Sequence, residues 1–259
     1  MGPLRTVILA AGKGKRMSSE RAKVLHLLCG KPLLSYVIQT AQEVGAEEIV
    51  VVVGHQREVV KGRFAGQGLI FVEQKEQLGT GHAVLQASHQ FNGYEGTVLI
   101  MCGDVPLVRP GTIKELLAFH KKERALVTIL TAHLPDPTGY GRIIKNQKGE
   151  VIKIVEESDA DTKEKAICEI NTGIYCIESP FLFAALQEVG RANAQGEYYL
   201  TDVVTIALKR GEIVRNFAVR DFREVVGINT PEELLKAHRY LEELTGISDH
   251  EDRLSFPQK

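Results

Sequence analysis

Near its N-terminus the chain reads Thr6-Val-Ile-Leu-Ala-Ala-Gly-Lys-Gly-Lys-Arg-Met17, an apolar run that breaks into glycines interleaved with cations. The segment 7–9 contains β-formers with no polar residue between them, as is typical of a parallel strand covered on both faces. Gly12 and Gly14 then let the backbone adopt conformations that a Cβ would forbid and bring its N–H groups close to an anionic ligand. The pattern predicts an α/β fold in which a buried strand leads into a phosphate-binding loop.

The cations of this loop support the same interpretation. Lys13, Lys15 and Arg16 concentrate positive charge within a few residues, which suits a polyphosphate better than a single carboxylate. The dinucleotide-binding fingerprint is excluded because Met17 stands where it needs a third glycine, and the P-loop spacing is absent. From this stretch alone, an ordinary glycine-rich turn with solvated cations remains the alternative.

Composition limits the class of protein. A chain of 259 residues with 44% apolar content can form one large α/β domain or two small ones. A net charge of −1 argues against a nucleic-acid or membrane-surface partner. No apolar run approaches the roughly 20 residues of a membrane span, so we expect a cytoplasmic protein.

The cysteines form no C-x-x-C pair and are spread through apolar segments. This spacing predicts reduced, buried thiols rather than disulfides or a zinc site. The residues concerned are Cys29, Cys102, Cys168 and Cys176.

Hydrophobic periodicity predicts strands and helices in alternation. Strands are expected at 49–53, 69–73, 97–104, 126–133 and 213–219, and helices at 32–44, 79–89, 110–122, 180–189, 202–209 and 231–244. Between 135 and 178 the pattern changes, and turn signals separate short strands at 141–145 and 151–155. These two strands predict an antiparallel hairpin inserted in the parallel fold.

A family resemblance becomes visible when the first loop is read together with its continuation. Leu9-Ala-Ala-Gly-Lys-Gly-x-Arg-Met17, followed by Lys23-Val-Leu-His26 and Gly30-Lys-Pro32, resembles the signature of the sugar-1-phosphate nucleotidylyltransferases. It is most similar to the N-acetylglucosamine-1-phosphate uridyltransferase domain of the bifunctional bacterial enzymes. The resemblance implies a Rossmann-like, mostly parallel sheet flanked by helices, with a small antiparallel sugar-binding lobe. It also implies UTP and a sugar 1-phosphate as substrates and Mg²⁺ as the cofactor.

The domain organisation follows from the same resemblance. We expect a single nucleotidyltransferase domain over 1–247, with the nucleotide-binding core at 1–133 and 201–247 and the sugar-binding lobe at 134–200. Residues 248–259 are expected to form a polar tail. No hexapeptide repeat follows in this sequence, so we expect no acetyltransferase activity from it.

A second stretch, Gln74-Lys-Glu-Gln-Leu-Gly-Thr-Gly-His-Ala83, has the groups needed to read a pyrimidine edge. Gln74 offers a donor and an acceptor, while Gly79 and Thr80 stand at an expected helix N-terminus. A glycine-softened helix cap is the alternative. The resemblance implies nucleotide contacts by Leu9, Ala10, Gly12, Gly14, Gln74, Gly79 and Thr80.

Two oxygen ligands for a metal are expected far apart in the chain. Asp104 ends an apolar strand, and ligands collect at the carboxyl ends of strands in open α/β sheets. Asn229 precedes Thr230 and Glu233, which form the pattern of a capping box. A turn-capping aspartate and a turn asparagine are the alternatives. The resemblance implies that Asp104 and Asn229 bind Mg²⁺.

The acceptor sugar is expected to meet four residues. Gly141, Glu156 and Asn171 supply a backbone N–H, an acceptor and an amide, a set that can hold sugar hydroxyls and an N-acetyl group. Each one alone would be read as a turn or surface residue, and Thr201 as a helix cap. The resemblance implies acceptor contacts for all four.

The chemistry implied by the resemblance needs no general base, because a phosphate monoester is already mostly dianionic at pH 7. Alignment and charge neutralisation do the work. Arg16 is expected to hold the leaving β,γ-phosphates, and Lys23 to meet the charge at the α-phosphate.

Two positions depart from the family pattern: Ala22 stands where proline is common, and Ser158 where lysine is usual. Three other functions remain open. A nucleotidylyltransferase for another base or sugar is one, and a catalytically silent sugar-nucleotide sensor is the second. The third, a dinucleotide-binding oxidoreductase, is disfavoured by Met17.

Overall fold

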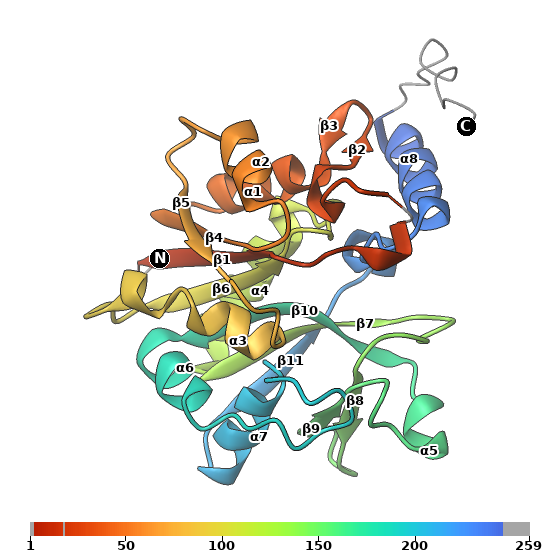
Figure 1. The fold of residues 1–259 in the computed structure, drawn as a ribbon. Coiled ribbons are helices and arrows are strands. Elements are labelled where there is room, and N and C mark those ends of the chain that lie inside the picture. Colours follow the sequence, from red (N-terminus) through yellow and green to blue (C-terminus); the bar gives the residue numbers. More distant parts are fainter. Residues whose placement is uncertain (1–2, 18, 246–259) are drawn as a thin grey trace.

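The computed structural model describes residues 3–17 and 19–245, which form a twisted sheet with helices on both faces (Figure 1). In spatial order the main strands are β11 (Val214–Ala218), β7 (Val127–His133), β10 (Glu169–Glu178), β6 (Thr97–Cys102), β1 (Leu4–Ala10), β4 (Glu48–Val53) and β5 (Ile70–Glu73). All neighbours pair in parallel except β10, which runs antiparallel to both β6 and β7. The predicted Rossmann-like, mostly parallel sheet is confirmed.

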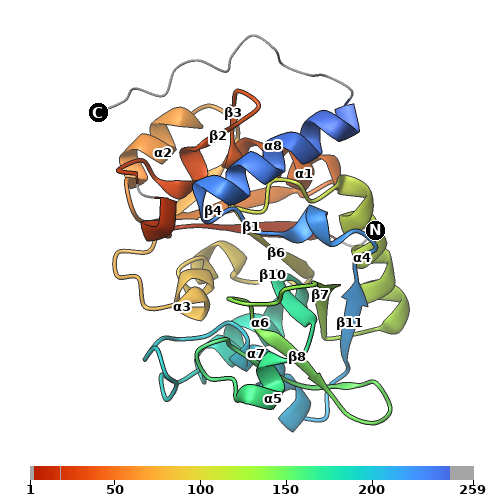
Figure 2. The same ribbon diagram turned by 90° about the vertical axis from the view of Figure 1, so that its right-hand side faces the viewer.

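Helices cover the two faces of this sheet (Figure 2). The α-helices are α1 (Leu33–Glu43), α2 (Arg57–Arg63), α3 (Thr80–Leu85), α4 (Pro110–Glu123), α5 (Thr162–Lys165), α6 (Ser179–Leu186), α7 (Asp202–Lys209) and α8 (Pro231–Thr245). Short 3₁₀ turns are η1 (Lys15–Met17), η2 (Lys23–Leu25), η3 (Ser88–Phe91) and η4 (Phe222–Val225). The expected helix 79–89 is shorter than predicted, because α3 ends at Leu85 and the chain continues into η3.

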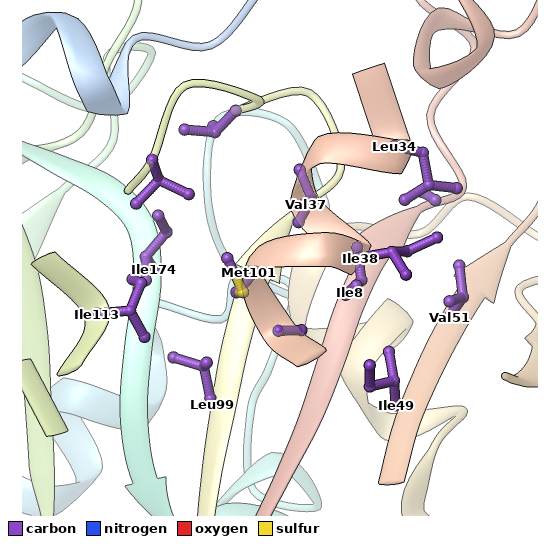
Figure 3. Close-up of a cluster of buried hydrophobic side chains, with 14 of the residues drawn as sticks. Ile8, Leu34, Val37, Ile38, Ile49, Val51, Leu99, Met101, Ile113 and Ile174 are labelled. Atoms are coloured by element: carbon purple, nitrogen blue, oxygen red, sulfur yellow. The ribbon is translucent and has the colours of Figure 1, made fainter. Parts of the chain in front are cut away.

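The strands divide their side chains between two cores. Ile8 of β1 packs in one cluster with residues of α1 and α4, whereas its neighbour Val7 packs in a second cluster with residues of α3, α6 and α7. Figure 3 shows the first cluster, in which Ile38 of α1 lies beside Ile8 of β1. The unbroken apolar runs of the central strands are therefore explained by burial on both faces.

The predicted hairpin is present. β8 (Arg142–Lys145) and β9 (Val151–Val155) pair antiparallel, and Arg142 of β8 also pairs with Ile170 of β10. The hairpin therefore extends from a strand of the main sheet. β10 and α6, which lie inside the expected lobe range 134–200, belong to the main sheet and its helical layer.

The last described helix, α8, packs against the small hairpin that follows the N-terminal loop. The small hairpin of β2 (Leu27–Leu28) and β3 (Lys31–Pro32) packs Leu28 against Ala237 of α8 in a third apolar cluster. The predicted capping box of α8 is confirmed, since the backbone N–H of Thr230 donates to Glu233 Oε2 at 3.0 Å and that of Glu233 donates to Thr230 Oγ1 at 3.2 Å.

The cysteines correct one expectation. No disulfide joins them in the described part of the chain, but only Cys176 is buried, while Cys168 is exposed and Cys29 and Cys102 are partly buried. Across the described residues, no helix has both the length and the apolar character that a membrane span requires. The expected tail 248–259 lies outside the described residues.

Candidate active site

Four of the predicted site residues meet at one point beside the carboxyl ends of β1 and β6. The Lys23 ammonium donates to the Asp104 carboxylate and, at 2.9 Å, to Asn229 Oδ1. Arg16 also donates to Asn229 Oδ1, at 3.1 Å. Residues separated by as many as 213 positions in the chain therefore share one polar cluster.

The backbone around Asp104 brings these segments together. Gly103 N–H donates to the Leu9 carbonyl at 2.9 Å, which ties the end of β6 to the end of β1. The Asp104 carbonyl accepts from Ile228 N–H at 2.8 Å, which seats the loop before α8 on the same point. The Gly227 carbonyl accepts from Asn229 Nδ2 at 3.0 Å, which leaves Asn229 Oδ1 to face Lys23.

The first loop packs against the stem of Lys23. Gly14 has φ +62°, and a Cβ there would lie 2.7 Å from the Cβ of Lys23, so only glycine fits. Gly12 is exposed, and a Cβ added to it would have no atom within 4 Å, so its backbone is open to a ligand. Leu9 and Ala10 end β1 just before this loop. The nucleotide contacts expected of these residues stay predictions.

Ala22, the first departure from the family pattern, has a structural explanation. Its backbone N–H donates to Gln56 Oε1 at 2.8 Å, and Gln56 Nε2 donates in turn to the Glu20 carbonyl at 2.7 Å. A proline at this position has no N–H to donate. Gln56 thus holds the segment before Lys23 by hydrogen bonds in place of a proline ring.

The stretch that starts at Gln74 is held by a segment from far along the chain. The N–H of Gly81 donates to the Tyr198 carbonyl at 2.8 Å, and the N–H of Leu200 donates to Thr80 Oγ1 at 3.1 Å. Gly79 has φ +111°, and a Cβ there would lie 2.5 Å from the Tyr198 carbonyl oxygen. This packing requires glycine at the N-cap of α3.

The four residues expected around the sugar are also brought together. Asn171 N–H donates to the Gly141 carbonyl at 2.8 Å, and Thr201 Oγ1 donates to Glu156 Oε1 at 3.1 Å. A Cβ on Gly141 would lie 3.2 Å from Glu156 Oε2. The alternative interpretation of Thr201 as a cap of α7 is wrong, because its backbone is helical and its hydroxyl makes no capping bond.

Burial controls two ionisable groups near these clusters. It raises the pKa of Glu156, an effect opposed by the hydrogen bond from Thr201 and reinforced by the carboxylate of Asp159. Burial, with a smaller contribution from the Asp104 carboxylate, also raises the pKa of Cys102 to about 12. Cys102 is therefore a neutral thiol at pH 7.

Comparison with known proteins identifies the family. Residues 6–169 match the model of the MobA-like NTP transferase domain. The chain belongs to this family. A bifunctional protein GlmU from Pelobacter propionicus is 47% identical over 242 residues, which are 93% of this chain and 53% of that protein. One from Pelotomaculum thermopropionicum is 49% identical over 238 residues, 92% of this chain and 52% of that protein.

This MobA-like NTP transferase domain thus spans about half the length of the curated relatives it matches. Among solved structures, a UDP-glucose pyrophosphorylase complexed with UDP-glucose aligns with a TM-score of 0.73 at 19% sequence identity, covering 93% of this chain and 99% of that one. At this identity the likeness concerns the fold alone.

The donor set of this NTP transferase domain fits a hard divalent cation. Asp104 and Asn229 each direct an oxygen to the same Lys23 ammonium, so both oxygens already converge on a single positive charge. Within the described ranges, no cluster of three or more His, Cys, Asp or Glu side chains could hold a metal. Two protein oxygens completed by water and phosphate oxygens are a common arrangement for Mg²⁺.

Two residues of the site were not predicted. The Tyr140 hydroxyl accepts from Gly227 N–H at 3.1 Å and so joins the connection between β7 and β8 to the loop that carries Asn229. His82 lies with Nδ1 3.1 Å from Gln74 Nε2. His82 lies inside the stretch that starts at Gln74, and Tyr140 stands next to Gly141, but their roles depend on contacts with other segments.

Ser158, the second departure from the family pattern, is tied to the lobe that contains it. Its hydroxyl lies 3.2 Å from Asp159 Oδ2 and 3.3 Å from the Tyr199 hydroxyl. A neutral side chain therefore packs beside Asp159 where the family usually has a cation.

Proposed function

We propose that this chain transfers a uridylyl group from UTP to N-acetylglucosamine 1-phosphate, forming UDP-N-acetylglucosamine and pyrophosphate. The observation that carries the proposal is the convergence of two cations, Arg16 and Lys23, with two hard oxygen donors, Asp104 and Asn229. A protein that only binds a sugar nucleotide needs no cation for a leaving group. The GlmU relatives, at 47–49% identity, support the same assignment.

In the proposed reaction, an oxygen of the acceptor phosphate attacks the α-phosphorus of UTP in line. A new P–O bond forms as the bond to the β,γ-pyrophosphate breaks, and pyrophosphate leaves with the electron pair. The acceptor phosphate is already dianionic, so no protein group has to remove a proton. Lys23 meets the charge that develops at the α-phosphate, and the forked guanidinium of Arg16 holds the leaving β,γ-phosphates.

Transfers of phosphoryl and nucleotidyl groups generally use a divalent metal, and here we propose Mg²⁺. Asp104 and Asn229 would hold it. When bound, the ion neutralises negative charge on the phosphates. The open backbone of Gly12 and the close packing of Gly14 on Lys23 keep the loop within reach of the same phosphates.

On the acceptor side, we assign Gly141, Glu156, Asn171 and Thr201 to the sugar. The hydrogen bond from Thr201 orients the Glu156 carboxylate, which can accept from sugar hydroxyls. The base is assigned to Gln74, Gly79 and Thr80. Both substrates are products of cytoplasmic metabolism, so we place the activity in the cytoplasm.

The test is release of pyrophosphate from UTP, N-acetylglucosamine 1-phosphate and Mg²⁺. We expect release that needs both substrates and stops when EDTA removes the metal. Parallel reactions with dTTP, GTP and other sugar 1-phosphates define the base and the sugar. Binding of UDP-N-acetylglucosamine without any pyrophosphate release would instead show a sensor.

A further inference from the structure

The amide of Gln74 is held in one orientation. The side chain, 4% exposed, stands just after β5 with Nε2 3.0 Å from the Gly79 carbonyl oxygen and 3.1 Å from His82 Nδ1. A peptide carbonyl only accepts hydrogen bonds, so the atom that faces it must be the NH₂ group. The Gly79 contact therefore defines which end of the amide is nitrogen.

The second amide hydrogen then points at His82, which has to accept it at Nδ1. This places the ring proton on Nε2. Nε2 lies 3.1 Å from Gln86 Nε2, which also donates to the His82 carbonyl oxygen at 3.1 Å. Both amides therefore present an NH₂ group to the ring, and a neutral imidazole can accept only one of them. Gln86 is partly exposed and can turn its amide and exchange the ring contact for water, whereas buried Gln74 cannot, so Nδ1 is the acceptor. The imidazole is also stacked on Tyr198, with ring centroids 6.1 Å apart. Hydrogen bonds at its nitrogens and stacking on Tyr198 therefore restrain the imidazole ring of His82.

With both hydrogens engaged, Oε1 is the part of the Gln74 amide that remains for a ligand. In the described part of the chain, no hydrogen bond reaches this oxygen. A fixed acceptor discriminates by requiring a donor from the ligand, because an opposing acceptor would leave two lone pairs facing each other without water. Uracil presents a protonated N3, whereas cytosine presents an unprotonated N3 at the same position of the ring.

We propose that His82 is a positioning residue for base selection: by accepting from Gln74 Nε2 it keeps Oε1 directed at the base, and so favours UTP over CTP. The inference rests on the proposed assignment of Gln74 to the base. His82 itself touches no substrate in this account. Without its acceptor, only the Gly79 carbonyl opposes rotation of the amide, and the rotated amide would offer a donor that suits cytosine.

Two substitutions of similar size separate the acceptor from the packing. His82→Leu removes the acceptor, whereas His82→Asn keeps an oxygen near the position of Nδ1. The measurement is the ratio of kcat/KM for UTP to kcat/KM for CTP in the full chain. One hydrogen bond of this kind changes an equilibrium by up to about tenfold, so we expect the ratio to fall about tenfold in His82→Leu and to stay within about twofold of wild type in His82→Asn.

An unchanged ratio in His82→Leu would overturn the proposal, as would an equal fall in both variants, which would mean that ring packing rather than the acceptor matters. Equilibrium binding of UTP and CTP by calorimetry gives the same comparison without turnover. If wild-type protein binds UTP but releases no pyrophosphate, the proposed reaction fails, and the ratio of the two dissociation constants still tests His82.

Discussion

At Lys23 a single ammonium group is shared between the carboxylate of Asp104 and the amide oxygen of Asn229. The stem of Lys23 lies against Gly14, so the loop that precedes it fixes where the charge can stand. A charge placed in advance of the reaction needs no reorganisation when negative charge develops on a phosphate. The identity of this residue should therefore affect turnover far more than folding.

We expect Lys23→Ala to lower kcat for pyrophosphate release by about 10²- to 10³-fold, as for other losses of a preorganised charge. Lys31→Ala is the matched control, because Lys31 is an exposed lysine on the nearby β2–β3 hairpin. Steady-state kinetics with UTP and the acceptor measure the effect, and circular dichroism checks the fold. A Lys23→Ala enzyme within a few fold of wild type would remove Lys23 from the mechanism.

At the scale of elements, the start of α3 depends on the segment around Tyr198. The two meet through backbone hydrogen bonds on both sides of Tyr198, to Leu78 and Gly81, each 2.8 Å long. The contact leaves no space for a side chain at Gly79. The stretch from Gln74 to Ala83 and the segment that leads to Thr201 are therefore one packed unit.

We expect Gly79→Ala to destabilise the fold by about 2 kcal/mol or more, because a left-handed backbone and a close approach are both violated. Gly111→Ala in α4 is the control: no atom lies within 4 Å of its added Cβ, and alanine favours a helix, so stability should hold or rise by up to about 1 kcal/mol. Urea unfolding measures both. Equal stabilities for the two variants would contradict the packing account.

The sequence predicted the elements whose residues repeat a simple pattern. Residues 49–53 of the strand Glu48–Val53 are all β-branched, and the strand was predicted to within one residue. β10 was not predicted as a strand, because a bulge between Asn171 and Tyr175 breaks its alternation. Helix Arg57–Arg63 was missed since Val60 is its one buried residue, too few for an apolar face.

The candidate site also contains both residues that the sequence could predict and residues that it could not. The convergence of Asp104 with Asn229 could be predicted because each residue follows or precedes a recognisable element and both belong to one family pattern. His82 and Tyr140 could not be assigned, since their partners are set by the positions of a backbone carbonyl and a distant N–H. Their side-chain types alone fit many roles.

At the scale of the whole molecule, Asp221 ties α8 to the end of the sheet. Its carboxylate accepts from Arg223 Nε at 2.9 Å and from the hydroxyl of Tyr240 in α8 at 3.0 Å. These hydrogen bonds lower the pKa of Asp221 to about 2, and the bond from Arg223 has the largest effect. An unfolded aspartate titrates near pH ~4, so the folded state binds the proton more weakly.

Because the pKa of Asp221 is lower in the folded state, its ionised carboxylate stabilises the fold at pH values above the unfolded pKa. This stabilisation is lost as the pH falls through the folded pKa. We expect Asp221→Asn to be less stable than wild type at pH 7, and the difference to shrink between about pH 4 and pH 2 as the wild-type carboxylate gains its proton. Chemical unfolding across this range measures it. A constant difference at every pH would show that Asp221 contributes by shape rather than by charge.

Asn229 lies 206 residues after Lys23 in the chain, in the loop that precedes α8. A ribosome delivers the N-terminal part first, so Arg16, Lys23 and Asp104 are made long before their last partner. A nascent chain that stops short of this loop has cations able to attract a nucleotide but lacks one oxygen donor of the cluster. Under the proposed function, we expect such an incomplete chain not to turn over UTP.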